Sequence, residues 1–310
     1  MNVFLWHVHG SWTTALVQGS HRYYLPVVPG RGPDGRGRAR SWEWPGSAVE
    51  VTPEEAGHLD IDVLIVQGYD ELSLASRWLR RRPGRDIRTI FVEHNAPQGR
   101  IADMRHPVAD RSDIGLVHVT HFNRLFWDSG EAPTRVIDHG IIDPGYRYTG
   151  RKGSAAVVIN EPVRRGRVTG TDLLGMFGRS MALDLYGMGV GLLGGHEDLS
   201  QDQLHERMPE HRIYLHPNRW TSLGLSLIEA MHLGMPVVAL ATTEVPTLVS
   251  PDTGIVGTDV ERLATEAARL MSDRERCVAM GKAGRQLALE RFGLQRFLDD
   301  WDEVLTGAWP

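Results

Sequence analysis

The stretch HPNRWTSLGLSLIEAMHLGMPVVAL (residues 216–240) holds a turn, a helix and a strand in direct succession. Apolar residues at helical spacing predict a helix over 226–233, and Gly234 stands where a helix is commonly followed by glycine. A proline then opens a strand over 237–240. The small-residue turn at 221–224 feeds the helix N-terminus, which presents unpaired N–H groups and a partial positive charge. These features suit a bound diphosphate.

Glu229 lies in the first turns of this predicted helix. From there a carboxylate can reach two vicinal ribose hydroxyls. The alternative is a glutamate that merely faces solvent, and the apolar pattern around Glu229 favours the ligand role.

Working outward, short apolar runs alternate with stretches of helical spacing along the whole chain. This alternation predicts parallel sheets built from right-handed β–α–β units. The pattern restarts near residue 155, and the preceding residues 143–154 have turn composition, so they are predicted to link two doubly wound domains. Such domains bind ligands at the carboxyl ends of their strands, so we expect the site in the cleft between them. The predicted strands are 3–8, 62–67, 89–93, 115–120, 135–137, 155–160, 182–186, 213–215 and 236–240.

Length and composition exclude several classes of protein. The 310 residues are enough for about two domains, and 41% hydrophobic with 24% charged residues is typical of a folded soluble chain. The net charge of −5 offers no basic excess for nucleic acid, and no apolar run is long enough for a transmembrane segment. Cys277 is the single cysteine, which excludes disulfides and thiolate zinc sites. Without a signal-peptide pattern at the N-terminus, we expect a cytoplasmic protein. Lysine makes up only two of the 34 basic residues, a bias that favours a GC-rich bacterial source.

The 216–240 segment resembles the donor-binding signature of GT-B glycosyltransferases, in particular the large retaining family 4 (glycosyl transferases group 1). The resemblance implies an α/β fold with two Rossmann-like domains facing across a cleft: residues 1–148 on the acceptor side and 149–289 binding the nucleotide sugar. It also implies that a helix over 290–310 packs back on the first domain. The matching residues are Gly224, Leu225, Glu229, Ala230, Met231, Gly234, Pro236, Val237, Val238 and Ala239.

The same resemblance assigns roles within the C-terminal half. Glu229 is expected to bind ribose and the turn of Ser222, Leu223, Gly224 and Leu225 to bind the pyrophosphate. The family's first glutamate, which commonly holds hydroxyls of the donor sugar, falls on Thr221, so the sugar-binding position carries a different side chain here. Downstream, Glu244 is expected near the nucleotide.

Residues 157–177 resemble the phosphate-clamping strand, loop and helix of the family. The family's lysine falls on Thr169, so the positive charge for the leaving diphosphate must come from the arginine-rich loop. We expect Arg164 and Arg167 to supply it, Arg165 being the third arginine of that loop. The alternative is that all three are solvated surface charges.

In the N-terminal half, polar residues follow the predicted strands. Gly10 and Ser11 are expected to form the first-strand loop facing the donor. His94 matches a histidine that lines the family's reaction centre and is the first catalytic candidate, against the alternative of a capped strand end. His121 and Asn123 follow the next strand as weaker candidates. His7 and His9 have the spacing of metal ligands, but no third ligand has suitable spacing, so a structural pair is favoured over a metal site. The segment 30–46, rich in glycine and arginine with two tryptophans, predicts a mobile surface loop or a lid.

The sequence therefore predicts a metal-independent glycosyltransferase, with no bound cofactor, that transfers a sugar from a nucleotide-diphosphate sugar to a small-molecule or glycan acceptor. Two alternatives stay open: a catalytically degenerate GT-B subunit that binds nucleotide or a partner protein, and a nucleotide-sugar epimerase or hydrolase of the same fold. The base, the sugar, the acceptor and the oligomeric state are left undetermined by the sequence.

Overall fold

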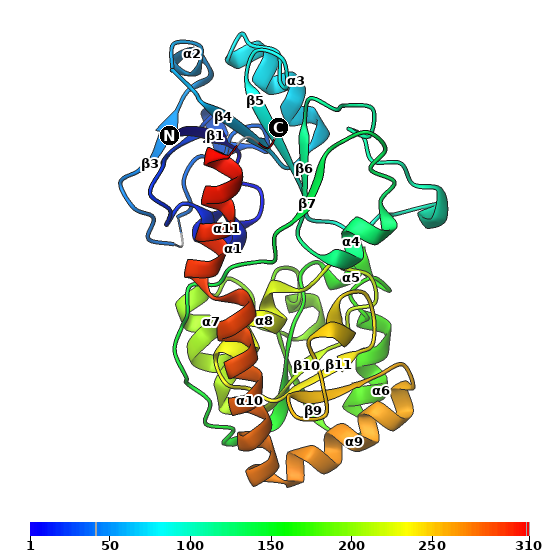
Figure 1. Cartoon of the computed structure of the whole chain (residues 1–310). Helices are drawn as coiled ribbons and strands as arrows, with labels where there is room; N and C mark the ends of the chain where they lie inside the picture. Colours follow the sequence, from blue (N-terminus) through cyan, green and yellow to red (C-terminus); the bar gives the residue numbers. More distant parts are fainter. Residues whose placement is uncertain (41, 308, 310) are drawn as a thin grey trace. The chain divides into compact units, whose positions relative to one another are not determined.

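The computed structural model describes residues 1–40, 42–307 and 309, and the chain divides into two compact units (Figure 1). Unit 1 comprises Met1–Ile141 and Leu294–Pro310, and unit 2 comprises Ile142–Gly293. The division falls earlier than the expected boundary at 148/149, because the linker is bonded to unit 2. Arg147 and Tyr148 both donate backbone N–H groups to the carbonyl of Leu233.

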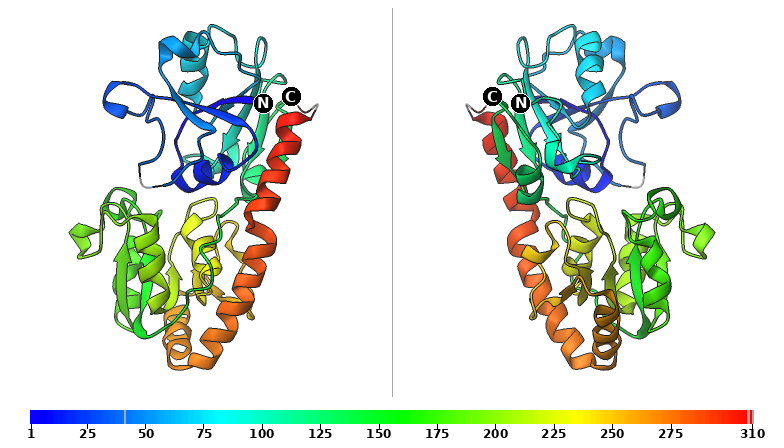
Figure 2. Two further views of the ribbon diagram at one scale, coloured as in Figure 1. Left: turned by 90° about the vertical axis from the view of Figure 1, so that its left-hand side faces the viewer. Right: turned by 90° about the vertical axis from the view of Figure 1, so that its right-hand side faces the viewer.

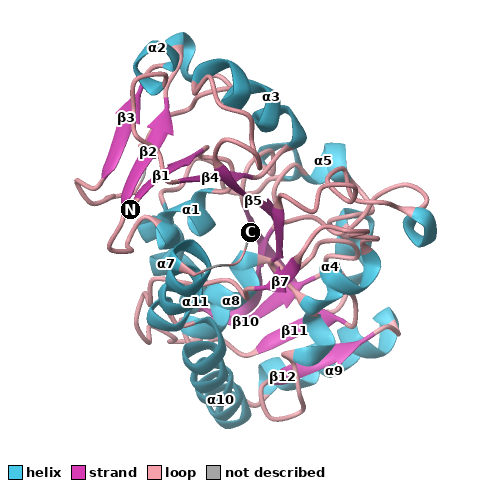
Figure 3. Cartoon of the chain, turned by 45° about the horizontal axis from the view of Figure 1, so that its top comes forward, coloured by secondary structure: helices cyan, strands magenta, loops and turns pink. Residues whose placement is uncertain are grey.

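Unit 1 contains a seven-stranded sheet in which every neighbouring pair is parallel, in the order β3-β2-β1-β4-β5-β6-β7 (Figure 3). Helices pack on both faces. The strands are β1 (Asn2–Leu5), β2 (Arg22–Pro26), β3 (Ala48–Val51), β4 (Val63–Val66), β5 (Arg88–Glu93), β6 (Gly115–His118) and β7 (Thr134–Val136). The helices are α1 (Gly10–Leu16), α2 (Pro53–Ala56), α3 (Tyr69–Trp78), α4 (His121–Phe126) and α11 (Leu294–Thr306).

The alternation of side chains along each strand divides the core of unit 1 into two layers. In β4, Val63 and Ile65 pack with α1 and α11, whereas Leu64 and Val66 pack with α3. On the first face, the rings of Trp301 of α11 and Trp12 of α1 pack edge to face, with their centroids 5.5 Å apart. The last helix of the chain is therefore part of the core of unit 1.

The segment 30–46 differs from the expected mobile loop. Trp44 is 6% exposed, and its indole N–H donates to Oγ1 of Thr14 over 2.9 Å. Arg38 donates to the backbone carbonyls of Trp44, Pro45 and Ala48. Trp44 thus anchors its part of the segment to the core of unit 1. The glycine and arginine content of the segment does not indicate this contact. Residue 41 lies outside the described residues.

Unit 2 contains a five-stranded parallel sheet in the order β12-β11-β10-β8-β9. Helices flank the strands of this unit as well (Figure 2). The strands are β8 (Lys152–Val158), β9 (Ala182–Tyr186), β10 (His211–His216), β11 (Val237–Leu240) and β12 (Gly254–Gly257). The helices are α5 (Pro162–Arg165), α6 (Leu174–Gly178), α7 (Gln201–Arg207), α8 (Leu225–His232), α9 (Val260–Ser272) and α10 (Arg274–Phe292).

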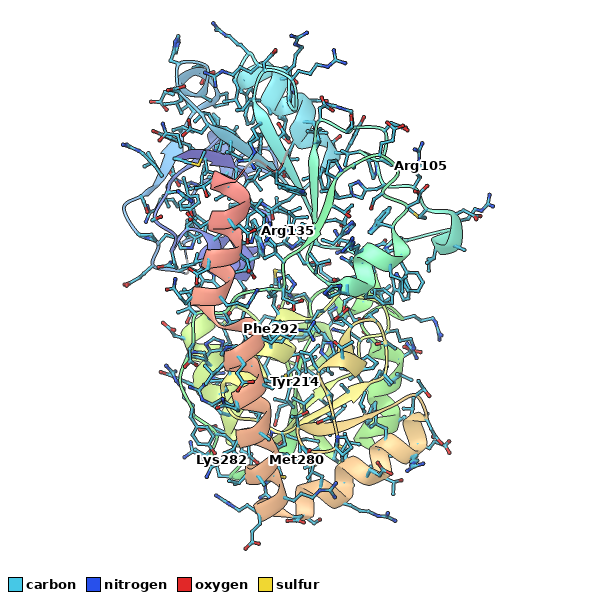
Figure 4. The ribbon with its side chains drawn as sticks, in the orientation of Figure 1. Arg105, Arg135, Tyr214, Met280, Lys282 and Phe292 are labelled. Atoms are coloured by element: carbon cyan, nitrogen blue, oxygen red, sulfur yellow. The ribbon has the colours of Figure 1, made fainter. Side chains whose placement is uncertain are left out.

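Helix α10 shows how these elements pack. Met280 is buried and Lys282, on the same helix, is exposed, while Tyr214 of β10 lies in the interior of the unit (Figure 4). The N-terminus of α10 is capped by Asp273, whose carboxylate accepts from the backbone N–H of Arg276. Within the described part of the chain, we find no helix with the length and apolar character needed to cross a membrane.

Candidate functional site

The turn before α8 is held against the end of β10. Gly224 is the N-cap, with an extended backbone and no side chain capping the helix. A Cβ atom at Gly224 would lie 2.5 Å from Cε1 of His216, so only glycine allows this close approach. Ser222 and Leu223 are buried and Thr221 is partly exposed, and Leu225 is the first residue of α8, one residue earlier than predicted. The N-cap of α8 thus lies against the last residue of β10, and the helix N-terminus that follows it presents backbone N–H groups suited to an anion.

Glu229 lies in the second turn of α8 and is 4% exposed. Its Oε2 atom is 3.6 Å from Nε2 of His205, a residue of α7 that the sequence reasoning missed. The charge of Glu229 also affects the pKa values of two nearby groups, Tyr214 and His232. Burial raises the pKa of Tyr214, to which Glu229 adds a smaller contribution, and burial lowers the pKa of His232, which Glu229 slightly opposes. The carboxylate is therefore enclosed by protein groups from β10, α7 and α8.

The arginine-rich loop follows β8, the neighbour of β10 in the sheet. Its first two arginines, Arg164 and Arg165, lie in the short helix α5 and not in a loop as predicted, whereas Arg167 follows that helix. Nε of Arg164 is 2.9 Å from Glu161, and Nη1 of Arg167 is 3.2 Å from Asp172. Asp172 is also bound by Arg219, which lowers the pKa of this carboxyl. The two arginines expected to hold the diphosphate are thus both exposed and already ion-paired.

Arg165 has different surroundings. Its side chain is half-buried, and within residues 1–40, 42–307 and 309 its guanidinium forms no hydrogen bond or ion pair. Burial is the main cause that lowers its pKa, with a further contribution from Arg164. Thr169, at the place of the family's lysine, is 1% exposed and uses its hydroxyl within the loop, on Gly166 and Thr171. Of the three arginines, Arg165 has the guanidinium most available to an anion.

Glu244, the last candidate in unit 2, forms an ion pair with Arg291. Its Oε1 atom lies 3.0 Å from Nη2 of Arg291, and Thr247 donates its hydroxyl to the same carboxylate. The side chain is 3% exposed. Its carboxylate therefore connects the loop after β11 to the end of α10.

In unit 1, three histidines from three strand ends form a cluster. His94 follows β5, and its ring centroid lies 4.0 Å from that of His9, the N-cap of α1, and 6.3 Å from that of His139. Gly10 and Ser11 form the first turn of α1, directly after His9. The ring of His7 instead contacts the carbonyl of Gly37 at 3.1 Å. The candidates Gly10, Ser11 and His94 are thus brought to one edge of the sheet.

These imidazoles are neutral at pH 7. Burial, followed by the charges of Arg36 and His7, lowers the pKa of His9 to about 4. Burial is also the first cause that lowers the pKa of His139 to about 4 and the pKa of His94 well below its usual range. Nε2 of His94 is buried, and among the described residues it has no hydrogen-bond partner. A neutral imidazole nitrogen can donate to or accept from a hydroxyl, according to its tautomer.

The weaker candidates of unit 1 have local roles. Asn123 is buried and donates its side-chain amide to the carbonyl of Glu93 over 3.3 Å, whereas His121 is exposed at the start of α4. Glu93 itself accepts from His106 at 3.1 Å and from the backbone of Asn95 at 2.6 Å. This arrangement fixes the backbone on either side of His94. Across the described positions of the chain, no group of three or more histidine, cysteine, aspartate or glutamate side chains is arranged to hold a metal ion.

Comparison with known proteins assigns this architecture. Residues 195–287, which include α7, β10, α8 and β11, match the family profile described as Glycosyl transferases group 1. Sucrose-phosphate synthase from Thermosynechococcus elongatus superposes with a TM-score of 0.73 over 98% of both chains at 13% identity. The Anabaena protein HepE, solved in complex with UDP, superposes with a TM-score of 0.68 over 98% of this chain and 99% of its own, also at 13% identity. The fold is that of the GT-B glycosyltransferases.

Curated relatives match over shorter stretches. A GDP-mannose-dependent alpha-(1-6)-phosphatidylinositol monomannoside mannosyltransferase of Mycolicibacterium smegmatis is 31% identical over 161 residues, covering 47% of this chain and 42% of the relative. The lipopolysaccharide core biosynthesis mannosyltransferase LpsB of Rhizobium meliloti is 33% identical over 89 residues, covering 27% of this chain and 25% of the relative. The matched region thus spans less than half the length of either relative.

Proposed function

We propose that this GT-B chain is a glycosyltransferase that transfers a sugar from a nucleoside diphosphate sugar to an acceptor hydroxyl, with retention of configuration. The observation that carries this proposal is the element formed by Gly224, α8 and the buried Glu229. The glycine turn leaves the helix N-terminus open to a phosphate, and one turn further a carboxylate is present for a pair of vicinal hydroxyls. The family profile covers this element, which supports the assignment.

In the proposed mechanism, Glu229 accepts hydrogen bonds from the ribose hydroxyls, and the turn of residues 222–225 binds the diphosphate. Loss of the diphosphate creates an oxocarbenium-like centre on the sugar and negative charge on the leaving group. An arginine of the loop 164–167 stabilises that charge, because a guanidinium in a desolvated site binds phosphate strongly. Since Arg164 and Arg167 would each have to leave a carboxylate, we place Arg165 first in this role.

On the acceptor side, we propose that His94 positions a hydroxyl of the sugar or the acceptor. Its Nε2 atom is buried and has no hydrogen-bond partner within the described part of the chain, and its ring is neutral because of burial and the neighbouring histidines. Gly10 and Ser11 lie at the same edge of the sheet of unit 1. A neutral ring suits a hydroxyl group, which can serve as either donor or acceptor.

The names of the relatives guide the choice of donor. The mycobacterial relative is named for GDP-mannose, whereas the structural neighbour HepE was solved with UDP. Both nucleotides therefore belong in the first test. A thermal-shift panel of UDP-, GDP-, ADP- and TDP-sugars should identify the donor, because a ligand at a hundred times its Kd stabilises by about 2.7 kcal/mol.

The decisive experiment incubates the identified donor with and without a panel of small-molecule and glycan acceptors. Release of nucleotide that requires acceptor, with a new glycoside as product, supports transfer, and we expect the reaction to continue in EDTA. Conversion of the donor without acceptor would instead indicate an epimerase or hydrolase. Binding without turnover would favour a nucleotide-binding subunit, a second candidate suggested by Thr221 at the position of the family's sugar-binding glutamate.

A further inference from the structure

Helix α7 brings a histidine to the buried carboxylate of α8. Nε2 of His205 lies 3.6 Å from Oε2 of Glu229, and the two side chains are only 8% and 6% exposed. The same ring nitrogen lies 2.7 Å from the side-chain amide of Gln201, one helical turn earlier. The imidazole is thus placed between an amide on its own helix and a carboxylate on the neighbouring one.

This placement matters because a buried carboxylate needs hydrogen-bond donors that fix its orientation. At 3.6 Å the imidazole contacts the carboxylate at a distance longer than a hydrogen bond. A single ring N–H directed at Oε2 takes up one acceptor position of that oxygen, which has two lone pairs. The histidine can therefore orient the group through Oε2 alone.

We propose that His205 is a positioning residue for the nucleotide ribose, which it does not itself touch. Its ring N–H holds Oε2 of Glu229 so that the carboxylate faces the 2′- and 3′-hydroxyls together. The role requires the proton on Nε2, and the amide of Gln201 then turns its oxygen toward the ring, so that this one N–H is shared between Gln201 at 2.7 Å and Glu229 at 3.6 Å. This inference rests on the proposed ribose role of Glu229.

The test is ribose selectivity, defined as the Kd of a 2′,3′-dideoxynucleoside diphosphate divided by the Kd of the matching ribonucleotide. UDP, GDP and ADP are first compared by calorimetry on the full chain, and the tightest binder is used with its dideoxy analogue. The variants are His205→Leu, which removes the ring N–H, His205→Gln, whose amide can reach the position of Nε2, and His205→Asn, whose amide is too short. His196→Leu is the control, since His196 stacks on Tyr186 at 5.2 Å, in a part of unit 2 remote from Glu229 in sequence.

We expect His205→Leu and His205→Asn to lower ribose selectivity by roughly threefold to tenfold, mainly through weaker ribonucleotide binding. His205→Gln should restore most of the selectivity, and His196→Leu should leave it unchanged. If the leucine variant does not fold, the difference in ribose selectivity between the glutamine and asparagine variants still tests the role of His205.

Equal loss of affinity for both nucleotides, or unchanged selectivity in the leucine and asparagine variants, would overturn the role of His205 while leaving the ribose site intact. A wild-type protein that binds nucleotide without any ribose selectivity would instead refute the role of Glu229, and with it this inference. Absence of binding to UDP, GDP, ADP and TDP alike at millimolar concentration would refute the proposed function together with it.

Discussion

Replacement of Glu229 by glutamine is the sharpest single perturbation of the proposed donor site. The substitution keeps the size and shape of a side chain that is 4% exposed. It removes the negative charge and converts one acceptor oxygen into an NH₂ donor. The core contacts of α8 are therefore retained while the chemistry toward a ribose changes.

The magnitude follows from the type of hydrogen bond that is lost. A carboxylate that accepts from hydroxyl groups forms charge-assisted bonds, roughly twice as strong as neutral ones. In Glu229→Gln one ribose hydroxyl keeps a neutral acceptor and the other faces an amide that can rotate to donate. We expect nucleotide affinity to fall about tenfold, which corresponds to about 1.4 kcal/mol.

Titration calorimetry with the ribonucleoside diphosphate and its 2′,3′-dideoxy analogue measures this effect. The dideoxy compound should bind the wild type and the variant almost equally, because the hydroxyl partners are already absent. Thermal unfolding serves as the control and should change little, by about 1 kcal/mol or less, since the carboxylate packs against polar neighbours such as His205. Equal affinity of the two proteins for the ribonucleotide would show that α8 is not the ribose site, and the donor assignment would fail with it.

Three further perturbations probe the rest of the molecule. Arg165→Ala should weaken binding of a nucleoside diphosphate by about tenfold or more and leave binding of the nucleoside unchanged, with a smaller effect for Arg164→Ala; the reverse order in calorimetry would reject our ranking. Arg88 donates to the carbonyls of Val304 and Leu305 at the end of α11, so Arg88→Ala should destabilise unit 1 by about 2 kcal/mol and lower its melting temperature by about 4–8 °C in calorimetry. Burial lowers the pKa of His139 to about 4, below its unfolded value of 6.5, so stability is retained above pH 6.5 and is lost as the pH falls toward 4. His139→Asn should reduce the slope of stability against pH between 6 and 5 by up to about 1.4 kcal/mol per pH unit, and an unchanged slope in pH-dependent denaturant melts would contradict the buried neutral state.

The architecture was predictable because the central strands of parallel sheets are apolar on both faces. Runs such as 62–67 and 89–93 are visible as buried strands without any knowledge of their neighbours. The strands that the sequence reasoning missed lie at or beside the sheet edges: β3, β2 and β12. β12 begins and ends with glycine, and β2 begins with an exposed arginine and ends with proline, so pairing with neighbouring strands defines them more than their own composition does.

The sequence pattern predicted the turn and helix of the proposed donor site because their residues are neighbours in the sequence. Gly224 and the whole of α8, with Glu229 in it, lie within nine consecutive positions, and helix geometry fixes their spacing. His205 lies 24 residues before Glu229, on a different helix, and is one of 14 histidines. No periodicity or motif connects the two residues. Their contact is produced by the packing of α7 beside α8, so it becomes visible only in the folded unit.

For the arginine-rich loop, the sequence likewise did not predict which side chain is available to a ligand. The sequence contains three cations within residues 164–167, but the charge available to a ligand is the charge that remains after the fold has paired them. Asp172 pairs with Arg167 of the same loop and with Arg219, which lies 47 positions further along the chain. The backbone N–H groups of residues 219 and 220 bind the carbonyl of Val168, which holds this later segment beside the loop. Glu161 pairs with Arg164 in the same way from the preceding turn. Among the described residues, the guanidinium of Arg165 forms no hydrogen bond or ion pair, and the charge of Glu161 only partly opposes the effect of its burial. A phosphate would supply a bonded partner. Arg165 therefore stands out by a property that depends on every carboxylate in reach and that no count of arginines reveals.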